Sequence, residues 1–203
     1  MNKIRNFLPI ELNICLQLML SISGVLKTGM YQLPNKEVTM MDKIRILFLC
    51  NHNSARSQMA EGLLRHFYND KYEVFSAGTN PTSVHPLAIK VMAEIGIDIS
   101  KQYSKSIDEF SYFDIDLAVS VCKSSAKTNC ILCSSPMVMG RPELVNAKLH
   151  KTKRYQLHGF VDPSEVEGTE ERIMKFRSVR DQIKDWIVEQ FADLDIEDLK
   201  NDL

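Results

Sequence analysis

The apolar run IRILFLC, residues 44–50, constrains the fold of this chain more than any other segment. An almost unbroken series of aliphatic and aromatic side chains is typical of a strand that is buried on both faces of a parallel sheet. A polar loop follows, and then SQMAEGLLRHFY, residues 57–68, in which the apolar residues recur at helical spacing. A buried strand followed directly by a helix is typical of an α/β domain.

The rest of the chain continues this alternation. Strands are predicted at residues 72–78 and 114–122, with a helix at residues 85–96 between them. A long helix is predicted from about residue 169 to 191, because its apolar residues share one face: Ile173, Phe176, Val179, Ile183, Trp186 and Ile187. Residues 134–157 are weakly patterned, and we interpret them as an inserted loop or a mobile lid. The whole pattern predicts a parallel sheet with helices on both faces.

Both ends of the chain are predicted to lie outside this domain. Residues 1–40 contain a basic start and an apolar stretch, but polar residues interrupt that stretch and it is too short to cross a bilayer as a helix. Because Met40 and Met41 directly precede the first strand, we interpret residues 1–40 as an extension or a mis-assigned start, with a targeting segment as the alternative. The domain is then residues 41–192, and residues 193–203 form an acidic tail.

The composition gives no indication of a nucleic-acid-binding, membrane-binding or disulfide-rich protein. The chain has 25 Lys and Arg against 26 Asp and Glu, so its net charge of −1 gives no reason to expect binding to nucleic acid or to a membrane surface. An odd number of cysteines at low density disfavours a disulfide framework and favours reduced, reactive or metal-binding thiols. The five cysteines are Cys15, Cys50, Cys122, Cys130 and Cys133.

The loop between the first strand and the first helix is predicted to bind an oxyanion. In doubly wound sheets, ligands bind where strands end and helices begin, and here Cys50 ends the strand while Ser57 starts the helix. The backbone N–H groups of the loop and the helix dipole form an anion cradle, and such surroundings lower a cysteine pKa to roughly 3.5–7.5. The loop consists of Asn51, His52, Asn53, Ser54, Ala55 and Arg56.

Two side chains complete the predicted cradle. The planar fork of Arg56 can bind two oxygens of a tetrahedral oxyanion, and the Ser57 hydroxyl can donate to the Cys50 sulfur. A thiolate that faces a captured oxyanion is a nucleophile with its electrophile in place. The sequence therefore predicts nucleophilic chemistry at Cys50.

The segments FLCNHNSARSQMAEG, FSAG and FVDP resemble the low-molecular-weight protein tyrosine phosphatase fold, and more closely its arsenate reductase branch. The resemblance covers roughly residues 43–191, apart from the weakly patterned loop. It implies a four-stranded parallel sheet in a three-layer α/β/α arrangement, with Cys50 on the anion-binding loop. It also implies a cytoplasmic, monomeric enzyme that holds no tightly bound cofactor and no metal.

Asp162, in the segment GFVDPSE, is the candidate general acid. Pro163 keeps the preceding residue out of helical geometry, so a loop could present the Asp162 carboxyl, although an Asp-Pro pair is also typical of an ordinary turn. The family resemblance implies that Asp162 protonates the leaving oxygen. Ser164 stands where phosphatases of this fold usually carry an aromatic ring, and this loss weakens phosphotyrosine recognition.

The arsenate reductase resemblance further implies a relay of three thiols. Cys122 ends the third predicted strand, on the same rim of a parallel sheet as Cys50, although by itself it could be a small core residue. In the relay Cys122 attacks Cys50 and releases arsenite, and Cys130 then attacks Cys122, leaving a disulfide for thioredoxin to reduce. Cys133 is an alternative to Cys130 as the final thiol.

A cation site occurs beside the anion loop in some relatives. Asn53, Glu61 and Ser76 match its ligands, but Lys105 stands where an acidic ligand is expected. We hypothesise that the Lys105 ammonium replaces the bound potassium.

Three classes of function remain open at this point. The first is an arsenate reductase, for which phosphate and sulfate are competing oxyanions, and the second is a phosphotyrosine phosphatase, for which Cys50, Arg56 and Asp162 suffice. The third is a sensor in which clustered cysteines bind arsenite or a metal ion. A related alternative is a zinc site built from Cys122, Cys130, Cys133 and either His150 or His158.

Overall fold

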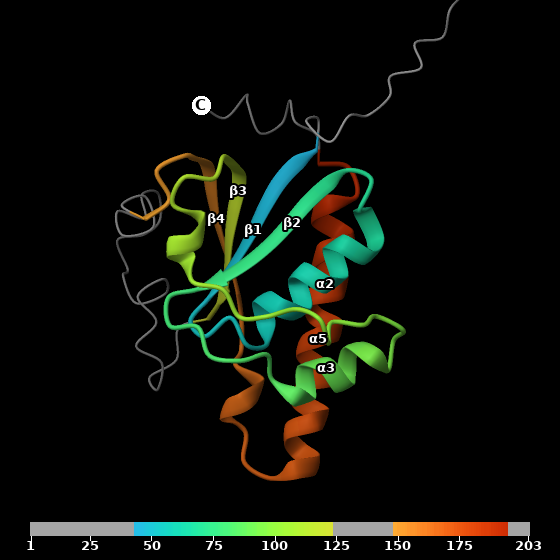
Figure 1. Cartoon of the computed structure of the whole chain (residues 1–203). Helices are drawn as coiled ribbons and strands as arrows, with labels where there is room; N and C mark the ends of the chain where they lie inside the picture. The colour runs from blue at the N-terminus through green and yellow to red at the C-terminus, as the bar shows by residue number, and fades with distance from the viewer. Residues whose placement is uncertain (1–42, 124–147, 195–203) are drawn as a thin grey trace, which may run out of the picture. The chain divides into compact units, whose positions relative to one another are not determined.

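The computed structural model describes residues 43–123 and 148–194, which contain one four-stranded parallel sheet of order β2-β1-β3-β4 (Figure 1). The strands are β1 (Ile44–Cys50), β2 (Tyr72–Gly78), β3 (Ile115–Cys122) and β4 (Thr152–Phe160). The helices are α2 (Arg56–Tyr68), α3 (Pro86–Ala93) and α5 (Thr169–Phe191), with the 3-10 turns η2 (Ile107–Phe110) and η3 (Pro163–Glu165). The predicted parallel α/β sheet is confirmed.

The core forms on both faces of the central strand β1. On one face, the Phe48 ring meets the rings of Trp186 and Phe191 edge-on, at centroid distances of 6.2 Å and 6.1 Å, so helix α5 packs here beside α2 (Figure 1). On the other face, Phe75 of β2 packs against Phe110 of η2 at 5.5 Å. Burial on both sides explains why the sequence of β1 is a nearly continuous run of apolar residues.

Strand β4 differs from the sequence prediction. The pattern assigned residues 152–157 to the inserted loop, but they form most of this strand. Strand β4 lies at the end of the sheet order and pairs with β3, and its side chains are mostly half-buried or exposed. Because such a strand needs no apolar run, only its backbone pairing with β3 reveals it. Residues 134–147 lie outside the described part of the chain.

The predicted extension, residues 1–40, also lies outside the described residues, as does the acidic tail from residue 195 onward. None of the helices in the described part of the chain has both the length and the apolar character needed to cross a membrane.

Replacing Phe48 by alanine should lower the free energy of unfolding by about 3–5 kcal/mol, because the substitution leaves a cavity against α5. The matched control is Met174→Ala on α5, where the side chain is 65% exposed and the expected change is below about 0.5 kcal/mol. Urea unfolding followed by far-UV circular dichroism measures both values. Similar losses in the two variants would contradict this account of the core.

Candidate active site

The carboxyl ends of β1, β3 and β4 bring three predicted site residues to one edge of the sheet. Strand β1 ends at Cys50, β3 ends at Cys122, and Asp162 follows the end of β4. Residues 51–55, called the anion loop below, connect Cys50 to helix α2, which begins at Arg56. Cys50 and Cys122 are both buried, and both are reduced thiols rather than halves of a disulfide.

The Cys50 sulfur lies inside a set of hydrogen-bonding groups. It is 2.9 Å from the Ser57 hydroxyl oxygen and accepts the backbone N–H of Asn53 at 3.1 Å. The Asn53 backbone reaches this position with a φ of +46°, a left-handed conformation that asparagine tolerates better than most residues. The anion loop therefore turns the backbone N–H of Asn53 toward the sulfur.

These surroundings lower the pKa of Cys50 to about 6. A hydrogen bond with the Cys122 side chain has the largest effect, ahead of the Ser57 hydroxyl, the positive charge of Arg56 and the Ser57 backbone N–H. Burial acts in the opposite direction, because it disfavours the charged form. With this pKa, Cys50 is mostly a thiolate at neutral pH, the form that acts as a nucleophile.

Arg56 connects the anion loop to the segment that follows β4. Its guanidinium is buried, donates to the Phe160 carbonyl oxygen at 3.1 Å and forms an ion pair with the Asp162 carboxylate. Asp162 caps η3 and accepts the backbone N–H of Ser164 at 3.0 Å, with Pro163 at the first position of the turn. The candidate general acid therefore lies at the anion loop, held there by its charge partner and by a local cap.

A buried polar network extends from the sulfur to the predicted cation site. The Asn53 amide donates to the Ser57 and Ser76 hydroxyls, both at 2.8 Å, and Ser76 donates to Glu61 at 2.5 Å. The Lys105 ammonium lies 3.4 Å from the same Glu61 carboxylate. The structure thus brings together all four residues of the predicted cation site.

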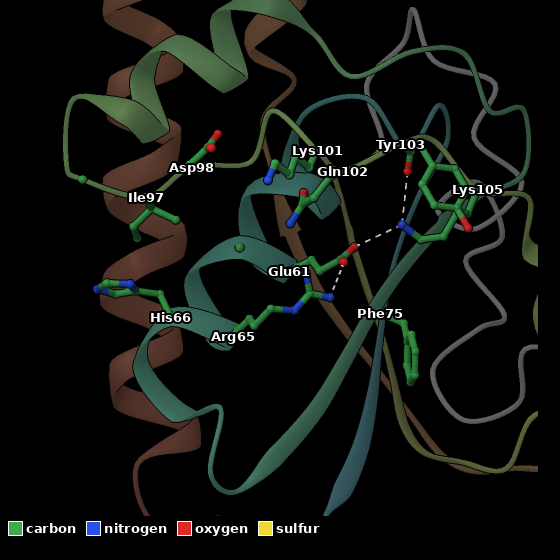
Figure 2. A pocket seen from close by; sticks show the side chains of 12 residues that line it. Glu61, Arg65, His66, Phe75, Ile97, Asp98, Lys101, Gln102, Tyr103 and Lys105 are labelled. Carbon is green, nitrogen blue, oxygen red and sulfur yellow. Dashed lines mark hydrogen bonds and ion pairs between the residues drawn. The ribbon is translucent and has the colours of Figure 1, made fainter.

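The Lys105 ammonium brings a positive charge to this group of residues. Figure 2 shows its ammonium pointing between the Tyr103 carbonyl oxygen, at 3.1 Å, and Glu61, whose other oxygen pairs with Arg65 at 2.5 Å. This ammonium would repel a metal ion that approached the Glu61 carboxylate. Within the described residues, no group of three or more His, Cys, Asp and Glu side chains is placed to hold a metal ion.

The remaining predicted residues give a mixed result. His52 lies on the exposed side of the anion loop, with its Nε2 3.0 Å from the Asn51 side-chain amide. His158 stacks on Trp186 at 4.6 Å, and burial lowers its pKa. Cys130 and Cys133 lie outside the described residues, so the last step of the relay and the zinc alternative remain untested predictions.

Sequence reasoning missed Gln58 and Gly78. The buried Gln58 amide donates to the backbone oxygen of Asn53 at 3.0 Å, to its side-chain oxygen at 2.9 Å and to the Tyr103 carbonyl at 2.9 Å. A Cβ atom on Gly78 would lie 2.6 Å from the Asn51 carbonyl oxygen, so only glycine lets the anion loop approach β2 here. A polar side chain in the first turn of a buried helix was the available signal for Gln58.

Residues 45–202 match the family model described as low molecular weight phosphotyrosine protein phosphatase. The chain belongs to this family. An arsenate reductase from Halalkalibacterium halodurans is 42% identical over 144 residues, which cover 70% of this chain and 91% of that protein. An arsenate reductase from Bacillus subtilis is 39% identical over 145 residues, covering 71% and 91%.

Solved structures agree with this placement in the phosphatase family. The structure of an arsenate reductase in the oxidized state has a TM-score of 0.55 at 30% identity, covering 73% of this chain and 96% of that one. A low molecular weight protein tyrosine phosphatase from T. tengcongensis shares the fold, with a TM-score of 0.52 at 22% identity over 75% and 100% of the two chains. The predicted resemblance to the arsenate reductase branch is confirmed.

Alkylation of Cys50 by iodoacetamide should follow a titration with a midpoint near pH 6, because the thiolate is the reacting form and is lost as the pH falls through its pKa of about 6. Cys122→Ala should move the midpoint upward, since it removes the hydrogen bond that lowers this pKa most. Mass spectrometry of the Cys50 peptide follows the rate. Cys122→Ser, which keeps a hydroxyl donor, is the control, and equal midpoints for the alanine variant and wild type would refute the role of Cys122.

Proposed function

We propose that this protein is an arsenate reductase that acts through a relay of Cys50, Cys122 and Cys130, with thioredoxin as the electron donor. The observation that carries the proposal is that the paired parallel strands β1 and β3 end in Cys50 and Cys122, so a second buried thiol lies at the same sheet edge as the Cys50 thiol of a phosphatase-like loop. The Cys122 side chain also helps to lower the pKa of Cys50. A phosphatase finishes its reaction with water and has no use for that thiol. The arsenate reductases among the relatives favour the same activity.

The first step is attack of the Cys50 thiolate on arsenic(V). Inward-facing N–H groups of the anion loop and the Arg56 fork bind the oxyanion, which takes the place of Asp162 on the guanidinium. A sulfur–arsenic bond forms and an arsenic–oxygen bond breaks. The Asp162 carboxylate, freed from its ion pair, takes up a proton from the incoming dihydrogen arsenate and delivers it to the departing oxygen, which leaves as water.

The second step transfers two electrons to arsenic. Cys122, after losing its proton, attacks the Cys50 sulfur and forms a disulfide, while the electron pair of the sulfur–arsenic bond stays on arsenic and yields arsenic(III). The Ser57 hydroxyl, 2.9 Å from that sulfur, stabilises it during the exchange. Cys130 then attacks Cys122 and releases the Cys50 thiolate, and the dithiol of thioredoxin reduces the resulting Cys122–Cys130 disulfide.

Phosphate and sulfate have the same tetrahedral shape as arsenate and should compete for the anion loop. A slow hydrolysis of aryl phosphates is compatible with the site, since Cys50, Arg56 and Asp162 are all present. Ser164 is engaged with the Asp162 carboxylate and offers no ring on which a phosphotyrosine could stack. We propose a monomeric enzyme that works in the cytoplasm, where thiols are kept reduced.

Wild-type protein should consume NADPH in an arsenate-dependent way when it is mixed with thioredoxin and thioredoxin reductase. Cys122→Ser and Cys130→Ser should each lose this turnover while still hydrolysing an aryl phosphate, because the first step needs neither thiol. Cys133→Ser is the matched control and should retain turnover. Aryl phosphate hydrolysis without arsenate turnover in the wild type would instead identify a phosphatase.

We also propose that Lys105 takes the place of a bound potassium ion. Its ammonium and Arg65 together neutralise the buried Glu61 carboxylate, which would otherwise be strongly destabilising. Hydrogen bonds from Asn53 to Ser76 and from Ser76 to Glu61 connect this charged group to the anion loop. In this way a side chain supplies the electrostatic support that a cation would give.

Potassium should therefore change neither the melting temperature nor the arsenate turnover of the wild type relative to sodium at equal ionic strength. Lys105→Asp, which removes the ammonium and supplies an acidic ligand, should melt at a lower temperature and recover more in potassium than in sodium. Differential scanning fluorimetry in the two salts makes the comparison. A clear potassium-specific gain in the wild type would show that Lys105 does not replace the ion.

A further inference from the structure

Four consecutive carbonyl groups of the anion loop are held by hydrogen bonds from outside the loop. Three of the donors are backbone N–H groups of one segment, residues 80–85, which we call the brace. The brace bonds are Asn80 N–H to the Asn51 oxygen at 2.8 Å, Thr82 N–H to the His52 oxygen at 3.2 Å and His85 N–H to the Ser54 oxygen at 2.8 Å. The Asn53 oxygen accepts from the Gln58 amide at 3.0 Å and from the Ser104 hydroxyl at 2.7 Å.

The direction of these carbonyls fixes the direction of the neighbouring N–H groups. In a trans peptide the C=O of one residue and the N–H of the next point in opposite directions. The peptide between His52 and Asn53 shows the consequence, because its oxygen accepts from Thr82 while its N–H donates to the Cys50 sulfur at 3.1 Å. By the same geometry, the N–H groups of His52, Ser54 and Ala55 point away from their carbonyl partners and toward the loop interior.

We propose that the brace is a positioning element for oxyanion binding and that His85 is its key positioning residue. This inference rests on the proposed function, since it concerns how the same loop holds arsenate. The brace N–H groups bond to the carbonyl side of the loop, and the N–H groups of the loop are left to bind the oxyanion. The brace acts by keeping three carbonyl dipoles turned outward, so that the N–H groups converge before the anion arrives and no reorganisation is needed on binding.

His85 contacts two helices. Its Nδ1 accepts the backbone N–H of Leu87 at 3.1 Å and so caps helix α3, and its ring packs on Phe176 of α5 at 4.6 Å. The backbone N–H that reaches Ser54 is thereby tied to two helices. A donor that is held in place can orient a loop carbonyl. A donor on a freely moving segment would instead follow the movements of the carbonyl.

The backbone angles of His85 permit a sharp test. Its φ of −70° is within the range that proline adopts, so His85→Pro can keep the chain path while removing the N–H that binds Ser54. His85→Ala is the matched control, because it loses the same ring and cap but keeps the backbone N–H. The difference between these two variants isolates the brace hydrogen bond.

Inorganic phosphate is the probe, measured by isothermal titration and as a competitive inhibitor of aryl phosphate hydrolysis. His85→Pro should bind phosphate about tenfold more weakly than His85→Ala, the size expected when one hydrogen bond to a charged group is misaligned. Its KM for aryl phosphate should rise by a similar factor with little change in kcat. Equal phosphate affinities in the two folded variants would overturn the proposal.

Hydrogen exchange on wild-type protein tests the brace without any substitution. Saturating phosphate should slow the exchange of the Asn80, Thr82 and His85 amides by about tenfold, because the bound anion and the brace stabilise the same loop conformation. Unchanged exchange at these amides, when phosphate binds, would overturn the proposal. Phosphate binding that needs the brace, in a protein that does not reduce arsenate, would leave this inference standing and refute only the arsenate reductase assignment.

Discussion

The Asn53 side chain makes four hydrogen bonds in the protein interior, and the geometry of the site depends on them. Its amide nitrogen donates to Ser57 and Ser76, and its oxygen accepts from the Gln58 amide and from the backbone N–H of Lys105. These bonds use the full donor and acceptor capacity of an asparagine side chain. They hold the loop in its left-handed turn, so that the backbone N–H of Asn53 meets the thiolate.

A negative charge inside the protein must be compensated, and the structure contains two such charges, on the Cys50 sulfur and on the Glu61 carboxylate. The Cys50 sulfur is surrounded by N–H, hydroxyl and thiol donors, with the Arg56 charge close by. Behind these donors, the Glu61 carboxylate lies between Lys105 and Arg65 (Figure 2). Buried charges are tolerated when each is paired and hydrogen-bonded, and an unpaired member would be costly. The anion loop and the charged groups behind it are therefore parts of one network.

The same edge of the sheet holds groups with distinct chemical roles because parallel strands end together. Strand β1 supplies the low-pKa thiol of Cys50, β3 supplies a second thiol, and the segment after β4 supplies a carboxylate against the guanidinium of Arg56. Gly159 lets β4 lie close to the end of β3, since a Cβ atom there would lie 2.7 Å from the Cys122 carbonyl oxygen. The second thiol distinguishes chemistry that ends in a disulfide from chemistry that ends with water.

The sequence by itself determined the strand–loop–helix unit around Cys50, because its apolar run, its polar loop and its helical spacing are all local patterns. It also placed Arg56 and Ser57 at the start of the helix, which in the structure begins at Arg56, one residue earlier than predicted. The sequence predicted Cys122 on the same sheet edge as Cys50, but only the tertiary structure decided the contact of Asp162 with Arg56 and of the brace with the anion loop. The strand β4 was likewise revealed only by the tertiary structure, through its pairing with β3. Hydrogen bonds between distant backbone groups leave no periodic trace in the side chains, so folding alone reveals them.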